Sequence, residues 1–330
     1  MTIRAATEND VPAIVELLKL SLGENLLPKS EAFWNWKHNQ NPFGKSPVLL
    51  MEDAAKLVGV RAFMPWIWTK DGMHFKAIRA VDTATHPEYQ GKGIFKKLTL
   101  QLVNESKKND FDFIFNTPNE SSMPGYLKMG WTTAGKLGLR IRPSIPVIFN
   151  LIGLSKSPHD ERALETYDAK KIVMYSEALK RLIDINRMQR TSFLETEMSI
   201  EHLIWRYVSI PIHRYYCLHD LEDKQSFCLF FRPKQTKFGM EGRITDMLID
   251  FDKFSVKEFI NKVKNPFEKF DFMSIVGGNQ KVNPVLNKLL FLPNLNIGPT
   301  VTTRNLNLEN SQILLNFALW KPTLGDLELF

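Results

Sequence analysis

The stretch that decides the fold is Val81–Phe95, which reads VDTATHPEYQGKGIF. It predicts the end of a strand, a short loop with two glycines and a lysine, and a helix from about Ile94 through Glu105. Such a loop leaves backbone N–H groups unpaired at a helix N-terminus, where the helix dipole also favours negative charge. Because glycine has no side chain, Gly91 and Gly93 let the backbone approach a phosphate closely or adopt a positive φ. The pattern is therefore typical of a pyrophosphate-binding site.

A second informative segment lies farther along the chain. Phe111–Phe115 predicts a short buried strand, and the loop Asn116–Ser122 follows it. Residues 124–131 then read PGYLKMGW. The glycine loop itself is neither a Walker loop nor a dinucleotide fingerprint, because Gly-x-x-x-x-Gly-Lys-Ser/Thr and Gly-x-Gly-x-x-Gly are both absent from it.

The two segments together resemble the acyl-CoA site of the GNAT N-acyltransferases, and the resemblance covers residues 1–145. The family's loop reads Gln/Arg-x-x-Gly-x-Gly/Ala; Gln90 and Gly93 fit it, whereas Phe95 stands at the last small position. That side chain would crowd the first helical turn unless it points into the core. The second half of the family's site has Asn, a small residue and Tyr-x-x-x-Gly-Phe/Trp, matched here by Asn119, Ser122, Tyr126, Gly130 and Trp131.

The resemblance implies acetyl-CoA as co-substrate and a small-molecule primary amine as acceptor. It also implies that the strand ending near Ala84 and the strand Phe111–Phe115 splay apart to admit the pantetheine arm. The expected cofactor contacts are Ala84, Thr85, Gln90, Gly91, Lys92, Gly93, Ile94, Phe95, Asn119 and Ser122.

Transfer of the acetyl group needs a neutral amine, an oxyanion stabiliser and a proton for the departing thiolate. The resemblance assigns the proton to Tyr126, which could instead only pack the helix onto the sheet. The oxyanion donor is expected to be a backbone N–H around Thr83–Thr85. Asp82 is the candidate base, because burial in an apolar strand could raise its pKa. Alternatively Asp82 pairs with Arg79 or caps the loop. His86 and Glu88, which flank the loop and favour a turn or solvent, are the other candidate bases, and a water chain without a dedicated base is the remaining alternative.

The chain also contains an internal repeat. Trp36-Lys37 precedes Pro42 as Trp205-Arg206 precedes Pro211, at an offset of 169. Val81-Asp82 matches Ile249-Asp250 at an offset of 168, and Phe111–Phe113 matches Phe270–Phe272 at an offset of 159. The second copy thus lacks about nine residues where the first has its glycine loop, and Leu286 stands in place of Tyr126. The repeat predicts two copies of one fold, of which the second is degenerate.

The expected fold class is α+β, with two GNAT-like domains, each a mixed, mostly antiparallel twisted sheet flanked by helices. The domains are predicted at residues 1–145 and 200–330, joined by a linker and packing helix at 146–199. Within the linker, Pro143–Pro158 is proline-rich and follows a strand Lys136–Ile141, and Asp168–Asp184 has helical spacing. In the first domain we expect strand Ile3–Ala6, helix Asp10–Leu20, and strands Val48–Asp53, Leu57–Thr69 and His74–Ala84.

Composition sets the remaining limits. The 330 residues, 44% hydrophobic and 24% charged, are those of a globular cytoplasmic protein with no membrane span. The net charge of +7 comes from scattered lysines, which favours no nucleic-acid partner. Cys217 and Cys228 form neither a disulfide framework nor a metal site and are expected to be buried thiols. Oligomeric state is not determined by these features.

Two dense aromatic runs, Phe33–Trp36 and Met64–Trp68, are open to two interpretations. They either pack in the core and the domain interface, or they line an acceptor pocket that stacks on a sugar. An amino sugar in glycan biosynthesis is the first acceptor expected. The alternatives to an N-acetyltransferase are a Fem-like aminoacyl transferase and a non-catalytic acyl-CoA-binding module.

Overall fold

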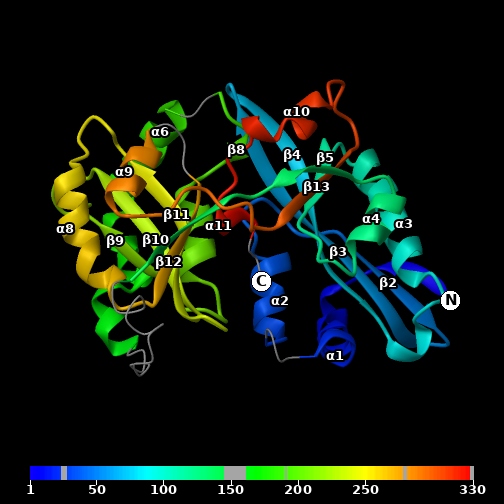
Figure 1. The fold of residues 1–330 in the computed structure, drawn as a ribbon. Coiled ribbons are helices and arrows are strands. Elements are labelled where there is room, and N and C mark those ends of the chain that lie inside the picture. Colours follow the sequence, from blue (N-terminus) through cyan, green and yellow to red (C-terminus); the bar gives the residue numbers. More distant parts are fainter. Residues whose placement is uncertain (24–27, 145–160, 190–191, 278–280, 328–330) are drawn as a thin grey trace.

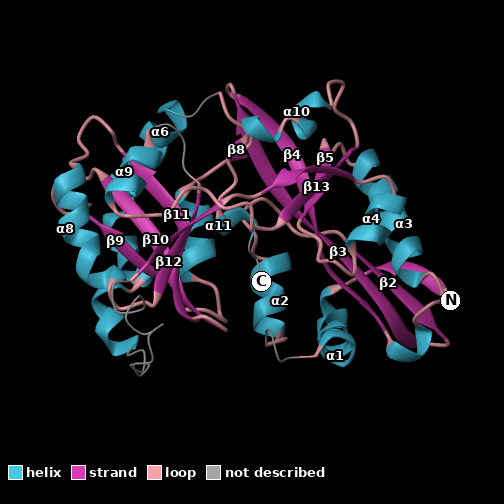
Figure 2. Cartoon of the chain, viewed as in Figure 1, coloured by secondary structure: helices cyan, strands magenta, loops and turns pink. Residues whose placement is uncertain are grey.

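The computed structural model describes residues 1–23, 28–144, 161–189, 192–277 and 281–327. Two twisted sheets, each flanked by helices, lie side by side (Figures 1 and 2). The strands are β1 Thr2–Ala5, β2 Val48–Asp53, β3 Lys56–Lys70, β4 Met73–Thr85, β5 Phe113–Asn116, β6 Thr132–Lys136, β7 Leu139–Pro143, β8 Glu195–Thr196, β9 Tyr216–His219, β10 Phe227–Thr236, β11 Gly239–Ile249, β12 Phe272–Val276 and β13 Thr300–Asn305. The helices are α1 Val11–Leu22, α2 Glu31–His38, α3 Ile94–Lys108, α4 Met123–Lys128, α6 Ser176–Gln189, α7 Ile200–Leu203, α8 Val256–Phe267, α9 Val282–Lys288, α10 Gln312–Leu315 and α11 Leu324–Leu327.

The first sheet runs β1-β2-β3-β4-β5-β13-β6, with β8 on the edge of β3. Its long antiparallel meander follows the predicted strands to within two residues, and the Asp71-Gly72 turn has positive φ at both positions, as a tight hairpin needs. Apolar residues of α3 and α4 cover one face of this sheet. Those of α1 and α2 cover the other face, at the end near β2. The fold class predicted from the sequence is confirmed.

The two halves of the chain exchange a strand. β13 lies between β5 and β6 of the first sheet, and β7 pairs with β12 at the edge of the second, whose order is β7-β12-β11-β10-β9. Only Leu137 and Gly138 separate β6 from β7, so the chain crosses from one sheet to the other in two residues. The predicted single strand Lys136–Ile141 is therefore wrong, because it joins two strands of different sheets. The sheets do not divide at residue 145, and each needs a strand from the other half.

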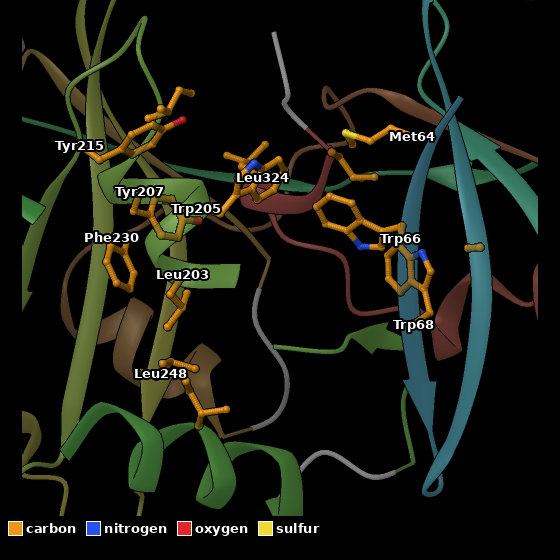
Figure 3. Close-up of a cluster of buried hydrophobic side chains, with 14 of the residues drawn as sticks. Met64, Trp66, Trp68, Leu203, Trp205, Tyr207, Tyr215, Phe230, Leu248 and Leu324 are labelled. Atoms are coloured by element: carbon orange, nitrogen blue, oxygen red, sulfur yellow. The ribbon is translucent and has the colours of Figure 1, made fainter. Parts of the chain in front are cut away.

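A shared apolar core joins the two sheets (Figure 3). Met64, Trp66 and Trp68 project from β3 toward Leu203 and Trp205, which lie at the end of α7 and in the π-helical turn Ile204–Val208. The core-packing interpretation of the aromatic runs is confirmed for Trp36, Trp66 and Trp68, which are at most 1% exposed.

The repeated tryptophans meet at the centre of this interface. The rings of Trp36 and Trp205 stack with centroids 4.5 Å apart. Each indole Nε1 donates to the other's backbone carbonyl, at 2.7 Å from Trp36 and 2.8 Å from Trp205. Equivalent residues making reciprocal bonds are what a two-fold relation between two copies of one fold produces. This contact supports the predicted duplication.

The segment between the halves differs from the prediction in part. Pro143 ends β7, and residues 145–160 of the proline-rich linker lie outside the described residues. The helix predicted at Asp168–Asp184 is a 3-10 helix over Ala169–Tyr175 followed by α6. α6 packs on the second sheet through Asn186, whose Nδ2 donates to the Ile249 carbonyl at 3.2 Å. Cys217 and Cys228 are buried free thiols, as expected.

Candidate active site

A cleft opens where β4 and β5 diverge. The strands pair in parallel at Ala77–Phe113, Ile78–Ile114 and Arg79–Phe115, and beyond that point β4 stays with β3 while β5 stays with β13. The cleft has a volume of about 660 Å³. Its polar lining comes from α2, from β4, and from the end of β5 through the connecting loop into α4: Lys37, Arg79, Asp82, Thr83, Asn116, Thr117, Asn119, Ser121, Ser122 and Tyr126. The predicted splay is present.

A β-bulge shapes the β4 wall of the cleft. Arg61 pairs with Thr83 and Phe63 with Ala80, so Ala62 alone opposes the two residues Val81 and Asp82. A bulge turns backbone groups away from the regular ladder. The cleft reaches Thr83, whereas the Ala84 side chain packs on α1 and the Thr85 carbonyl accepts from Ser21 Oγ at 3.0 Å. A backbone N–H in 81–83 is thus better placed for an oxyanion than one at Thr85.

The glycine loop leaves the N-terminus of α3 open. Gly91 and Gly93 have φ of 75° and 76°, and a Cβ at either position would meet nothing within 4 Å. Gly93 is the residue before α3 and has no side chain to cap the helix. Within the described residues, no protein acceptor is found for the backbone N–H groups of residues 91–96. These are the features of an anion seat, with Lys92 exposed beside it.

Phe95 fits despite its size. Its half-buried ring packs edge-on against Tyr126, with centroids 5.6 Å apart. Gly125 makes room, since a Cβ there would lie 3.3 Å from Phe95 Cε1. The side chain thus turns toward α4 and lines the cleft, which leaves its amide at the open helix end.

The start of α4 is held by Asn119. Its Oδ1 accepts from the Ser122 N–H at 2.9 Å, and its carbonyl accepts from the Met123 N–H at 2.9 Å. This turn places Ser122 and, one helical turn later, Tyr126 on the cleft. Tyr126 is 4% exposed, and its hydroxyl accepts a hydrogen bond of 2.7 Å from Arg61 Nη2. Its ring also packs on Trp131, so the packing role and the cleft position coexist.

Comparison with known proteins bears on this arrangement. Residues 2–134 match the family model described as an acetyltransferase (GNAT) domain. This match assigns residues 2–134 to the GNAT superfamily. The chain is 29% identical over 119 residues to the L-methionine sulfoximine/L-methionine sulfone acetyltransferase of Salmonella typhimurium. That match covers 33% of this chain and 64% of the relative's length.

Solved structures share the fold over nearly the whole chain. A probable N-acyltransferase from Enterococcus faecalis superposes with a TM-score of 0.63 at 12% identity, covering 96% of this chain and 74% of that one. A GCN5-related N-acetyltransferase from Anabaena variabilis gives 0.62 at 16% identity, over 93% and 73%. N-myristoyltransferase from Saccharomyces cerevisiae gives 0.55 at 11% identity, over 92% and 78%. The two-sheet layout is therefore one that other proteins share.

Asp82 does not have the environment that the sequence suggested. Burial alone would raise its pKa, but Lys37 Nζ and His38 Nε2 each lie 2.8 Å from Oδ2 and hold the pKa well below its usual range. The predicted reason for a base, a raised pKa, is wrong. His38 has a pKa lowered by burial, so the neutral ring donates to Asp82 while Nδ1 accepts from the Ser46 hydroxyl. Lys37 and Asp82 together form a charged pair on the cleft wall.

The second half of the chain has side chains of different chemistry at the equivalent positions. The parallel pairs Ala77–Phe113 and Glu241–Phe272 relate β4 to β11 at an offset of 164. The counterpart of Asp82 is therefore Asp246, and the sequence match to Asp250 is wrong. His38 corresponds at offset 169 to Tyr207, whose hydroxyl hydrogen bonds to Asp246. This second match of position and partner strengthens the duplication.

No comparable anion seat exists between β11 and α8. Residues 250–255 link them without a glycine, and Ser255 caps α8 by accepting from the Glu258 N–H at 3.4 Å. The N-terminus of α8 is thus closed by a side chain where that of α3 is open. Leu286, the counterpart of Tyr126, is 1% exposed and packs in the second core.

Several features of the site were missed by sequence reasoning. Lys37, His38 and Arg61 come from α2 and β3, far in sequence from the residues they contact. The one available signal was that Lys37 lies in the repeated Trp-Lys/Arg pair. Among the described residues there is no cluster of three or more side chains that could hold a metal. None of the described helices is long and apolar enough to span a membrane.

Proposed function

We propose that this protein transfers an acetyl group from acetyl-CoA to the primary amine of a small molecule. The observation that carries the proposal is a cleft lined by the diverging strands β4 and β5, by Phe95 in the first turn of α3 and by the buried Tyr126, next to the open helix N-terminus at residues 91–96. A pyrophosphate would bind at the open end of α3, with Lys92 adding positive charge. The pantetheine arm would lie along the unpaired edge of β4 beyond Arg79 and bring the thioester toward Tyr126.

Different groups of the cleft then act at successive steps of the transfer. The amine nitrogen attacks the thioester carbon, and a backbone N–H of the bulge at Val81–Thr83 stabilises the oxygen that becomes negative. As the C–S bond breaks, Tyr126 gives its proton to the thiolate. The proton lost by the nitrogen returns to Tyr126 through water. Asp82, held as an anion by Lys37 and His38, orients the wall of the site and is not assigned the base role.

The acceptor is proposed by class only. An amino sugar remains the first candidate from the sequence. An α-amino acid derivative is the second, because the relative from Salmonella typhimurium is named for methionine derivatives and because Lys37 and Arg79 place cations on the cleft wall. A panel containing both kinds of amine, assayed for release of free CoA thiol, separates them.

Calorimetry with acetyl-CoA and with CoA tests the cofactor site directly. Gly93→Trp should abolish binding, because the added ring fills the open seat. Gly72→Trp is a matched control: it has the same φ of 76°, an equally open environment, and a place in the β3–β4 turn. Both variants carry the same backbone strain, so only the first should lose affinity. Wild-type protein that binds no CoA at high micromolar ligand would contradict the proposal.

The alternatives make different predictions in the same experiments. A Fem-like aminoacyl transferase should bind tRNA in a salt-sensitive manner and bind no CoA. A non-catalytic module should bind CoA but release no thiol with any amine of the panel.

A further inference from the structure

Arg61 is a fully buried cation on β3, directly opposite Thr83 at the bulge. Within the described residues it has no carboxylate in ion-pair range, and its partners are two oxygens and three rings. Nη1 donates to the Val81 carbonyl at 2.7 Å, and Nη2 donates to the Tyr126 hydroxyl at 2.7 Å. A buried charge of this kind is expensive unless something around it gains from the charge.

The direction of the Arg61–Tyr126 bond fixes the direction of the tyrosine proton. A guanidinium has only donors, so the Tyr126 oxygen must be the acceptor. Its own hydrogen therefore points away from Arg61. Tyr126 lines the cleft, and no described protein group accepts from its hydroxyl. The O–H is left free to point into the cleft, where the thioester sulfur is expected.

The other arm of Arg61 acts on the opposite part of the site. Val81 is one of the two bulge residues, and its carbonyl is held by Nη1. One planar side chain thus ties the bulge, which carries the oxyanion N–H, to the hydroxyl that protonates the leaving group. The fork geometry of arginine suits two such bonds, whereas a lysine can reach only one partner well.

We propose that Arg61 is a positioning residue of the transfer reaction. It aims the Tyr126 proton into the cleft, and its charge stabilises the negative charge that develops on the phenol oxygen as the proton moves to the thiolate. The inference rests on the proposed function, because it assigns Tyr126 the proton transfer. In that step the O–H bond breaks, the S–H bond forms, and the phenolate beside Arg61 is later reprotonated by the proton released from the amine.

A double-mutant cycle on kcat tests the coupling. Arg61→Met should lower kcat about 10- to 100-fold with little change in CoA affinity, and Tyr126→Phe should lower it at least as much. The double variant should lose much less than the product of the two single losses, because part of the effect of Arg61 acts through that hydroxyl. Arg61→Lys should recover part of the rate. Multiplicative losses in the double variant would overturn the proposal.

A matched control separates positioning from stability. Arg140 on β7 is also buried, at 4% exposed, and donates to the Leu292 and Phe291 carbonyls outside the cleft. Arg140→Met should lower the midpoint of unfolding but leave kcat of the folded protein unchanged. If Arg61→Met does not fold, the same cycle is run with Arg61→Lys.

A second readout does not depend on an acceptor. In protein labelled with ¹³Cζ-tyrosine, the Tyr126 resonance, assigned with Tyr126→Phe, should move when CoA binds. The same resonance in Arg61→Lys should start from a different position and respond less. Wild-type protein that transfers to no amine would contradict the proposed function alone, whereas a Tyr126 resonance unaffected by Arg61→Lys would contradict the role of Arg61.

Discussion

Removing Lys37 should destabilise the protein by an amount that depends on pH. Lys37 Nζ lies 2.8 Å from Asp82 Oδ2, with the two side chains 6% and 19% exposed. Breaking a buried ion pair by deleting one partner costs about 3–5 kcal/mol, because the other charge stays buried. Since Asp82 keeps some exposure toward the cleft and still accepts from His38, we expect Lys37→Met to cost about 3 kcal/mol at pH 7.5.

The pH dependence has a definite sign. In the wild type the pKa of Asp82 is lowered on folding, so its contribution to stability is present above its unfolded pKa and is lost as the pH falls below about 4. Without Lys37, one of the two groups that lower the pKa of Asp82 is gone, so burial raises that pKa in the folded variant. The folded variant then takes up a proton at a higher pH than the wild type does. The difference in stability between the two proteins should therefore shrink as the pH is lowered from 7.5 to 5.

Urea unfolding at the two pH values measures both effects. Lys37→Met/Asp82→Asn should recover much of the lost stability, because no uncompensated charge remains. Lys45→Met is the control: its exposed pair with Glu8, at 68% and 76% exposure, should contribute nothing measurable at either pH. A loss for Lys37→Met under about 1 kcal/mol, equal at pH 7.5 and 5, would refute the interpretation of Asp82 as a buried anion that depends on Lys37.

Three further predictions concern the asymmetry between the halves. Tyr126→Phe should slow transfer by about 10²-fold or more while CoA affinity stays nearly unchanged, as measured by single-turnover kinetics and calorimetry. Its counterpart Leu286→Ala should cost about 2–5 kcal/mol of unfolding free energy without altering kcat, since the side chain is 1% exposed in the second core. Calorimetry should also give one CoA per chain, because α3 has an open N-terminus whereas its equivalent α8 is capped. A stoichiometry of two would refute the assignment of the pyrophosphate-binding site to α3.

Local features of the sequence predicted local features of the structure. The strand, loop and helix around Gly91 and Gly93 formed as expected, because positive φ and the missing cap are properties of those residues alone. The repeated Trp36 and Trp205 predicted two related halves, and their reciprocal bonds follow from that relation. The aromatic runs were ambiguous in sequence, because stacking on a ligand and packing in an interface require the same residue types.

The features that sequence reasoning missed depend on distant contacts. The pKa of Asp82 is decided by Lys37, 45 residues earlier, and the proton of Tyr126 by Arg61, 65 residues earlier. The match of Asp82 to Asp250 failed because the register of β4 and β11 is set by their pairing with β5 and β12. The exchange of β7 and β13 was also missed, because a short strand carries no sequence record of which sheet edge it will join.

The strand exchange gives the second half of the chain a structural role in the cleft, although that half has no anion-binding helix N-terminus between β11 and α8. β13 belongs to the second half, yet it forms the ladder on which β5 lies, and Thr302 Oγ1 donates to Asn116 Oδ1 at 2.5 Å beside the cleft. The first sheet therefore cannot complete its β5 wall without residues 300–305. In the second half, burial and the charge of Asp326 raise the pKa of Asp246, whereas its counterpart Asp82 is held as an anion. The two halves thus differ in two ways: Asp82 is held as an anion whereas the pKa of Asp246 is raised, and the N-terminus of α3 is open whereas that of α8 is capped by Ser255. Loss of β13 would therefore remove the strand that pairs with the β5 wall of the cleft, even though the second half has no open helix N-terminus of its own between β11 and α8.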